Sequence, residues 1–307
     1  MTDFLPEGYL MENEENCMYM ESVSSLAQAA ADRRILQARA TVCDSAHNLT
    51  VDLGCIKGII PRKEGAIGVK EGTVRDIAVI SRVNRPVSFV ITGFDHDESG
   101  RTVAILSREA AQRRCLENYI NTLTVGDVVD ARITHLETFG AFADIGCGIV
   151  ALIPIDAISV SRIEHPAERF TVGMDIKAVI KSMENGRISL SHKELLGTWQ
   201  ENAENFSPGQ TVAGVIRSVE SYGAFVELAP NLAGLAELKD SVRVGQQASV
   251  YIKSIIPQKM KVKLIIVETF DYKYSPKKPE YYFEGRHMDE FVYSPEDCDK
   301  RIVTTFC

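Results

Sequence analysis

Apolar and polar residues alternate with a period of two through most of the chain, and the alternating runs recur in the same order. Gly-led runs at 126–136 and 209–219 each precede an aromatic tetrapeptide, Phe139–Phe142 in one copy and Tyr222–Phe225 in the other. Each tetrapeptide opens a second run, and a short apolar stretch and two further runs follow it. Alternation bounded by Gly and Pro predicts strands. Five short strands per repeated unit, or module, predict a small closed barrel, for which the oligonucleotide-binding (OB) barrel is the five-stranded candidate.

A third copy of the module lies upstream, between residues 35 and 107. Its Asp52-Leu-Gly-Cys55 matches Asp144-Ile-Gly-Cys147 of the second copy, and this match indicates a true repeat of the module. His47 and Thr50 stand where the other copies carry their aromatic residues. We therefore expect this first module to keep the barrel and to lack the rings.

The segments that precede and join the modules have a helical composition, at residues 22–34, 107–120 and 192–206. Helical linkers act as semi-rigid spacers. The predicted fold class is therefore all-β modules with helical linkers, in a tandem array of three five-stranded OB barrels. The predicted divisions are an acidic N-terminal extension with a helix at 1–33, a degenerate OB domain at 34–108, a linker at 109–123, an OB domain at 124–193, a linker at 194–207, an OB domain at 208–268 and an aromatic-rich C-terminal extension at 269–307. That last extension fits either a hairpin packed on the third module or a partner-binding segment.

Composition favours a globular protein of the cytoplasm. The chain is 45% hydrophobic and 25% charged, which is ordinary for folded domains. Seven cysteines occur without any Cys-x-x-Cys spacing, so we expect neither a zinc site nor a disulfide framework. No apolar run reaches the length of a membrane span, and the first residues are acidic where a secretory leader would be basic and apolar.

The net charge of −8 is concentrated outside the modules. Residues 1–33 hold one basic and seven acidic residues, whereas the first and third modules each hold two more basic than acidic residues. Net charge influences solubility and nonspecific association. It does not exclude a local basic face that binds nucleic acid.

The aromatic pairs carry the candidate chemistry. Residues three apart on a regular strand point to opposite faces. We therefore expect the backbone to bulge at Gly140 and at Gly223, so that both rings of a pair lie on one face. Two exposed rings would form a platform on which unpaired bases stack, at about 1–3 kcal/mol per base. The alternative is that one ring of each pair fills the barrel core.

Basic residues on the last predicted strand support the binding interpretation. Lys259, Lys261 and Lys263 alternate with apolar residues, which predicts three ammonium groups on one face of the third module. Arg187 alternates in the same way in the second module. Next to the ring pairs these cations would contact phosphates. The alternative is a solvated edge whose lysines prevent aggregation.

Together these motifs resemble the S1 RNA-binding domain, named for the largest protein of the small ribosomal subunit, over residues 35–268. Residues 191–201 also resemble the connector that joins such domains. The resemblance implies a row of OB barrels that bind single-stranded RNA, above all messenger RNA. The positions that match the family's RNA contacts and the adjoining basic residues give the candidate RNA-binding set: Arg101, Phe139, Phe142, Arg187, Tyr222, Phe225, Lys259, Lys261 and Lys263.

The sequence thus predicts a non-enzymatic, cytoplasmic bacterial RNA-binding protein of translation that resembles a shortened S1-family ribosomal protein. Its six histidines have no neighbours that form a catalytic or metal-binding constellation, so we expect neither cofactor nor metal. The expected partners are single-stranded RNA and, through the ring-less first module, proteins of the small ribosomal subunit. A non-ribosomal RNA-binding regulator and a protein-docking scaffold built from the same barrels stay open as alternatives.

Overall fold

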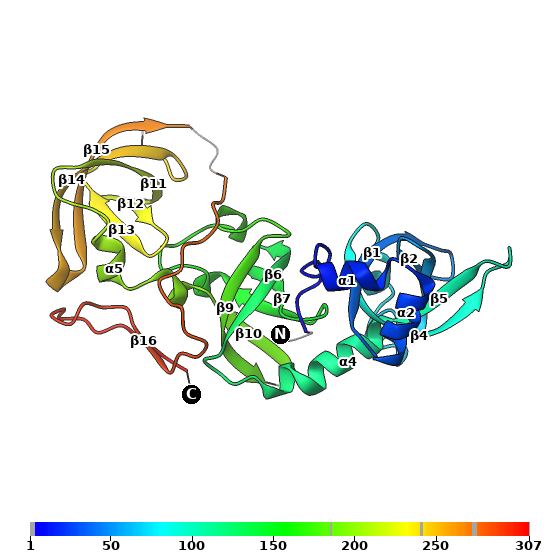
Figure 1. Cartoon of the computed structure of the whole chain (residues 1–307). Helices are drawn as coiled ribbons and strands as arrows, with labels where there is room; N and C mark the ends of the chain where they lie inside the picture. Colours follow the sequence, from blue (N-terminus) through cyan, green and yellow to red (C-terminus); the bar gives the residue numbers. More distant parts are fainter. Residues whose placement is uncertain (1–3, 185, 240–241, 272–274, 307) are drawn as a thin grey trace. The chain divides into compact units, whose positions relative to one another are not determined.

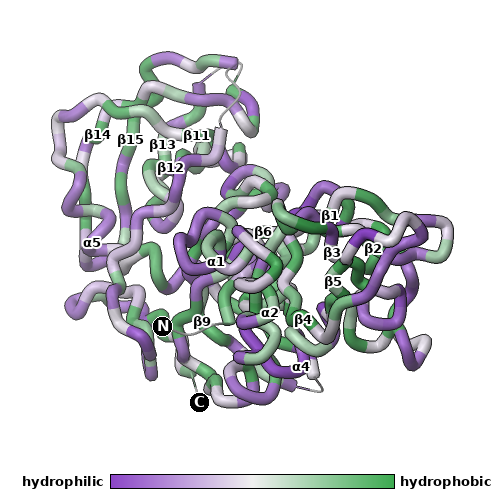
Figure 2. The backbone as a smooth tube through the Cα atoms, turned by 45° about the vertical axis from the view of Figure 1, so that its right-hand side comes forward, coloured by the Kyte–Doolittle hydropathy of each residue, from purple (hydrophilic) through white to green (hydrophobic). Residues whose placement is uncertain are grey.

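The computed structural model describes residues 4–184, 186–239, 242–271 and 275–306 and contains three closed five-stranded barrels (Figure 1). The predicted fold class is therefore confirmed. The chain forms two compact units, one of Met1–Leu123 with Asp144–Val150 and one of Thr124–Ala143 with Ala151–Cys307. No helix of the described residues is long and apolar enough to cross a bilayer. The hydrophobic stretches are short and are interrupted by hydrophilic ones (Figure 2).

Unit one holds barrel 1, whose strands run in the order β1-β2-β3-β5-β4. Its strands are β1 (Leu36–Cys43), β2 (Leu49–Asp52), β3 (Lys57–Ile60), β4 (Pro86–His96) and β5 (Thr102–Ser107). The helical elements of the unit are α1 (Glu14–Tyr19), α2 (Val23–Ala31), η1 (Arg62–Glu64), α3 (Ile77–Ile80), α4 (Arg108–Asn118) and η2 (Ile120–Thr122). Ser22 and Ser107 begin α2 and α4 by accepting hydrogen bonds from backbone N–H groups, and both predicted helices are confirmed.

A buried charge network fastens the N-terminal segment to unit one. The Glu7 carboxylate accepts hydrogen bonds from the Arg108 guanidinium at 2.6 and 3.1 Å, and the Glu7 N–H donates to Asp144 at 2.7 Å. Burial opposes ionisation of Glu7, but Arg108 and Arg82 hold its pKa below the usual value. Burial and then the charge of Glu7 raise the pKa of Asp144 to about 7. The arginines thus favour the ionised form of Glu7, and the charge of Glu7 in turn favours the protonated form of Asp144.

Unit two contains most of barrel 2 and the whole of barrel 3, with strand orders β10-β8-β7-β6-β9 and β11-β12-β13-β15-β14. Barrel 2 consists of β6 (Val128–Glu137), β7 (Gly140–Asp144), β8 (Val150–Pro154), β9 (Asp175–Glu184) and β10 (Arg187–Ser191), with η3 (Ile155–Ala157) and η4 (Pro166–Glu168) between β8 and β9. Barrel 3 consists of β11 (Thr211–Glu220), β12 (Gly223–Ala229), β13 (Leu232–Ala236), β14 (Gln247–Ile256), η6 (Pro257–Lys259) and β15 (Lys261–Phe270).

The helix expected over 192–206 is broken into two short pieces, η5 (Lys193–Leu196) and α5 (Trp199–Ala203). Gly197 between them has a φ of 84°, and a Cβ at this position would lie 2.7 Å from the Tyr282 ring. The chain must therefore turn at a glycine here. The expectation of one continuous helical linker was wrong.

The C-terminal extension folds back onto unit two. It forms the two-stranded sheet β16 (Glu290–Val292) and β17 (Val303–Thr305). The Tyr293 hydroxyl donates to the Asn231 carbonyl of barrel 3 at 2.6 Å, and the Met288 N–H donates to the Gly126 carbonyl at the start of barrel 2 at 2.8 Å. The hairpin alternative is therefore correct, but the extension packs on the second barrel as well as on the third.

Candidate nucleic-acid interface

The two rings of barrel 2 lie together on its surface. Phe139 and Phe142 have ring centroids 6.0 Å apart and planes at 88°, so one edge meets the other face. Phe139 is 55% exposed and Phe142 is partly buried. Neither ring lies in the barrel core. The pair can therefore offer aromatic faces to a ligand.

Barrel 3 repeats this arrangement with Tyr222 and Phe225. Their centroids are 6.3 Å apart and their planes meet at 90°. Tyr222 is 67% exposed, and Phe225 is partly buried. Two independent copies of one edge-to-face pair thus occur at equivalent places in two barrels.

Gly223, between the two rings of barrel 3, does not form the backbone bulge that the sequence predicts. Tyr222 precedes β12 and lies in the turn, so the strand alternation does not apply to it. The irregularity in strand pairing lies in β11, between Ile216 and Ser218, and not at Gly223. A Cβ on Gly223 would lie 2.6 Å from the Ala236 carbonyl oxygen. The predicted bulge was therefore wrong in barrel 3, where the glycine lets the neighbouring strand approach.

A third ring, which the sequence did not single out, extends the platform of barrel 2. His135 on β6 lies with its ring centroid 6.3 Å from that of Phe142 and nearly parallel to it, at 29°. Its Nε2 is 2.6 Å from a carboxylate oxygen of Glu137. The hairpin of β6 and β7 places position 135 beside Phe142, and this pairing is the signal that could have found it.

Strand register in barrel 3 sets an exposed cation beside the rings. Phe225 is paired with Leu235 on β13, and Leu235 is paired with Lys263 on β15. Directly paired residues share a face of the sheet. Lys261, two residues earlier on β15, lies on the same face as Lys263. Rings and ammonium groups therefore occupy one continuous surface.

Of the three lysines expected on one face of the last strand, only Lys261 and Lys263 lie on that strand. Val262 and Leu264 are both 2% exposed, as expected for residues that alternate with outward-facing lysines. Lys259, however, lies in η6, before the strand begins. Met260 follows it with a φ of 45°, so the chain reverses between Lys259 and Lys261. The expectation that Lys259 continues the strand was wrong.

The profile of the S1 RNA binding domain matches residues 122–193, which are the residues of barrel 2. Small ribosomal subunit protein bS1 of Staphylococcus aureus (strain COL) is 30% identical over 259 residues, which cover 72% of this chain and 66% of that protein. The bS1 homolog of Bacillus subtilis is 33% identical over 196 residues, or 62% of this chain and 49% of that protein. The chain is an S1-domain protein related to bS1.

This S1-domain chain spans about half the length of its B. subtilis relative. Its relatives form a non-enzymatic family of RNA-binding proteins. Among solved structures, a multidomain protein with nucleic acid binding domains from Streptococcus pneumoniae aligns over 77% of this chain and 74% of that chain, at 13% identity and a TM-score of 0.25. In the part of the chain that the structure describes, no group of three His, Cys, Asp or Glu side chains could hold a metal ion.

The three S1-type barrels differ in their charged positions. In barrel 2, Ser189 is paired with Leu152 as Lys263 is with Leu235, which places Arg187 at the position of Lys261. In barrel 1 the same pairing joins Ile59 and Ile105, and the position of Arg187 is taken by Val103. Barrel 1 therefore has apolar residues where the other two barrels have cations or a serine.

At the ring positions of barrel 1 stand Thr50 and His47, and His47 and Arg101 each lie beside an aspartate carboxylate. Thr50 is paired with Ile59 and so occupies the place of Phe225. His47 has its Nδ1 3.2 Å from a carboxylate oxygen of Asp76. Arg101 lies in the turn before β5 and pairs with Asp97 at 2.9 Å. Arg101 is exposed but stands outside the strand face on which Arg187 and Lys261 lie.

Proposed function

We propose that this S1-domain protein binds single-stranded RNA, messenger RNA in particular, and acts in translation in the cytoplasm as a ribosome-associated factor of the bS1 type. The observation that carries the proposal is the recurrence of one exposed ring pair in two consecutive barrels, each with basic residues on the adjoining strand. The proposed contacts are Phe139, Phe142 and Arg187 in barrel 2 and Tyr222, Phe225, Lys261 and Lys263 in barrel 3, with Lys259 and Arg101 as peripheral cations.

Two barrels bind better than one because the second contact is intramolecular. Stacking contributes about 1–3 kcal/mol per base and tolerates any base, since every base has an aromatic face. Linking two such sites raises affinity by roughly 10²–10⁴ where the spacing fits. Long unstructured RNA is therefore the preferred ligand over short oligomers.

Barrel 1 is proposed to contact proteins of the small ribosomal subunit. Its outer face pairs Ile59 with Ile105 and pairs Thr50 with Val42, which is 54% exposed. Val103 and Ile105 are apolar at the positions where the other two barrels carry the cations or the serine of the proposed RNA face. The proposal thus divides the chain into an RNA-binding part and a docking part.

Co-sedimentation with small ribosomal subunits, at low and at high salt and with homopolymeric RNA as competitor, tests the proposed function. We expect the chain to sediment with the subunit at low salt, and we expect its RNA binding to weaken steeply with salt. An RNA-binding chain that never sediments with the subunit would identify a free regulator. A chain that homopolymeric RNA does not compete for would be a scaffold.

A further inference from the structure

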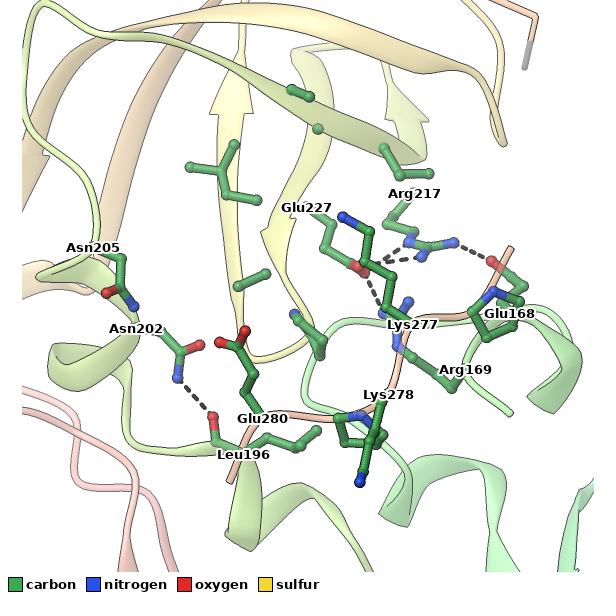
Figure 3. A pocket seen from close by; sticks show the side chains of 18 of the residues that line it. Glu168, Arg169, Leu196, Asn202, Asn205, Arg217, Glu227, Lys277, Lys278 and Glu280 are labelled. Carbon is green, nitrogen blue, oxygen red and sulfur yellow. Dashed lines mark hydrogen bonds and ion pairs between the residues drawn. The ribbon is translucent and has the colours of Figure 1, made fainter. Parts of the chain in front are cut away.

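A large cavity in unit two is lined in part by β11 and β12 of barrel 3 and has no role in the interface described above. Its volume is about 900 Å³, within the range of small-ligand sites. It is lined by residues of β11 and β12, by residues 168–170 and by residues 275–280 of the C-terminal extension (Figure 3). Segments more than a hundred residues apart in the sequence therefore build one site.

Four buried or half-buried charges hold the first two of these segments together. The Glu227 carboxylate accepts from Arg169 at 2.5 Å and from Arg217 at 2.7 and 3.2 Å, and Arg217 also pairs with Glu168. Burial opposes the charge of Arg217, but Glu227 and Glu168 outweigh it and raise the pKa of the guanidinium. Two arginines meet two glutamates, so this part of the lining is fixed and close to neutral.

The free positive charge comes from the extension. Lys277 and Lys278 line the cavity and are exposed. No ion pair between described residues involves either of them, in contrast to Arg169 and Arg217. Glu280 also lines the cavity but lies toward Asn202, away from Lys277 (Figure 3). The lining of the cavity therefore includes two ammonium groups that suit an anion.

The cavity also contains groups that suit a nucleoside. Tyr282 lines it and is 39% exposed, and its hydroxyl accepts a hydrogen bond from the Asn205 side-chain amide at 2.8 Å. An exposed tyrosine ring can stack with a base. Side-chain amides can donate to and accept from base edges and sugar hydroxyls.

The cavity continues the ring surface of barrel 3. Glu227 lies two residues beyond Phe225 on β12, hence on the same face and about 7 Å along the strand. Arg217 lies at the irregularity of β11 directly before Ser218, the residue paired with Phe225. A chain stacked on Tyr222 and Phe225 therefore reaches the cavity without crossing an edge of the barrel.

We propose that the cavity receives a nucleotide of the single-stranded RNA next to the bases stacked on Tyr222 and Phe225, with Lys277 and Lys278 binding its phosphate. This inference rests on the proposed RNA-binding function and extends its site beyond the barrel face. The C-terminal extension becomes a part of the RNA path and not only a packing element.

The test measures affinity against salt for the full chain with two labelled oligouridylates, of about four and about sixteen nucleotides, the limits of site size for one OB barrel. Lys277→Gln combined with Lys278→Gln removes both ammonium groups. Each neutralised phosphate contributes about −0.7 to the slope of log affinity against log salt for a single strand. We expect the double variant to flatten the slope for the long RNA by about 1.4, at two contacts, and to leave the short RNA unchanged. Lys300→Gln, on the same extension but outside the cavity, should alter neither.

An unaltered slope for the long RNA in the double variant overturns the inference. Tyr222→Ala combined with Phe225→Ala distinguishes this failure from failure of the proposed function, because the ring variant should weaken RNA binding wherever the phosphates run. If the unmodified chain binds neither oligouridylate, the proposed RNA-binding function itself is overturned. If neither pair of substitutions weakens binding of the long RNA, barrel 3 and its cavity are not part of the RNA site. If the lysine substitutions abolish binding of free uridine monophosphate and leave the RNA slope unchanged, the cavity is a mononucleotide site and the RNA path is refuted.

Discussion

Removal of the ring pair of barrel 2, by Phe139→Ala with Phe142→Ala, should weaken binding of a single-stranded RNA long enough to contact both barrels, while the barrel stays folded. Phe139 is 55% exposed, so its loss opens no cavity in the core. Phe142 packs against Phe139 and His135 at centroid distances of 6.0 and 6.3 Å, so its removal costs surface packing only. At about 1–3 kcal/mol per stacked base, two rings contribute about 2–6 kcal/mol at most. Even the lower limit corresponds to a roughly 30-fold weaker affinity.

Fluorescence anisotropy with a labelled oligouridylate measures this loss, and thermal unfolding by circular dichroism verifies the fold. The matched control is Phe270→Ala, because Phe270 is 45% exposed on β15 but belongs to neither ring pair. The control should bind as the unmodified chain does. If the double variant binds RNA unchanged, or if it unfolds, the rings are structural and the proposed platform is wrong.

Three further results are expected. Lys261→Gln with Lys263→Gln should flatten the salt slope of RNA affinity by about 1.4; an unaltered slope would mean that the lysines only protect the strand edge. Gly223→Ala should lower the free energy of unfolding by roughly 1–3 kcal/mol, because the new Cβ meets the backbone of β13; Gly93→Ala, where a Cβ meets nothing within 4 Å, is the control in thermal melts. Because the pKa of Asp144 is raised from 3.8 to about 7, the folded chain keeps a proton that the unfolded chain releases, so stability should fall as pH rises through this window. Asp144→Asn should flatten that fall, and an identical pH profile for the two proteins would refute the assignment.

The order of the elements could be predicted because the sequence repeats and because its alternation matches the barrel interior. Val262 and Leu264 are buried between exposed lysines, as the period of two requires. The same reasoning located the ring-less barrel, since Thr50 pairs with Ile59 as Phe225 pairs with Leu235. The alternation of apolar and polar residues was enough to predict the position of a residue wherever that residue contacts only its own strand and the neighbouring strand.

What the sequence did not predict depends on contacts between distant segments or on turns. Gly197 breaks the linker because the ring of Tyr282, from the far end of the chain, occupies the space of its absent Cβ. Lys259 leaves the strand because Met260 adopts a left-handed conformation, which is uncommon for a residue with a side chain. The cavity of unit two is likewise invisible in the pattern, since Lys277 and Arg217 come together only through folding of the extension.

The most direct test of the central claim compares four proteins on one long unstructured RNA: the unmodified chain, the chain without the barrel 2 rings, the chain without the barrel 3 rings, and the chain without both pairs. If the two barrels bind one RNA in tandem, removal of either ring pair also removes the advantage of linkage. The affinity should then fall by more than the stacking energy of that pair accounts for, with linkage contributing up to roughly 10²–10⁴. Loss of both pairs should then leave only weak, salt-sensitive attraction. A chain that lacks all four rings and still binds with the affinity of the unmodified protein would contradict the account.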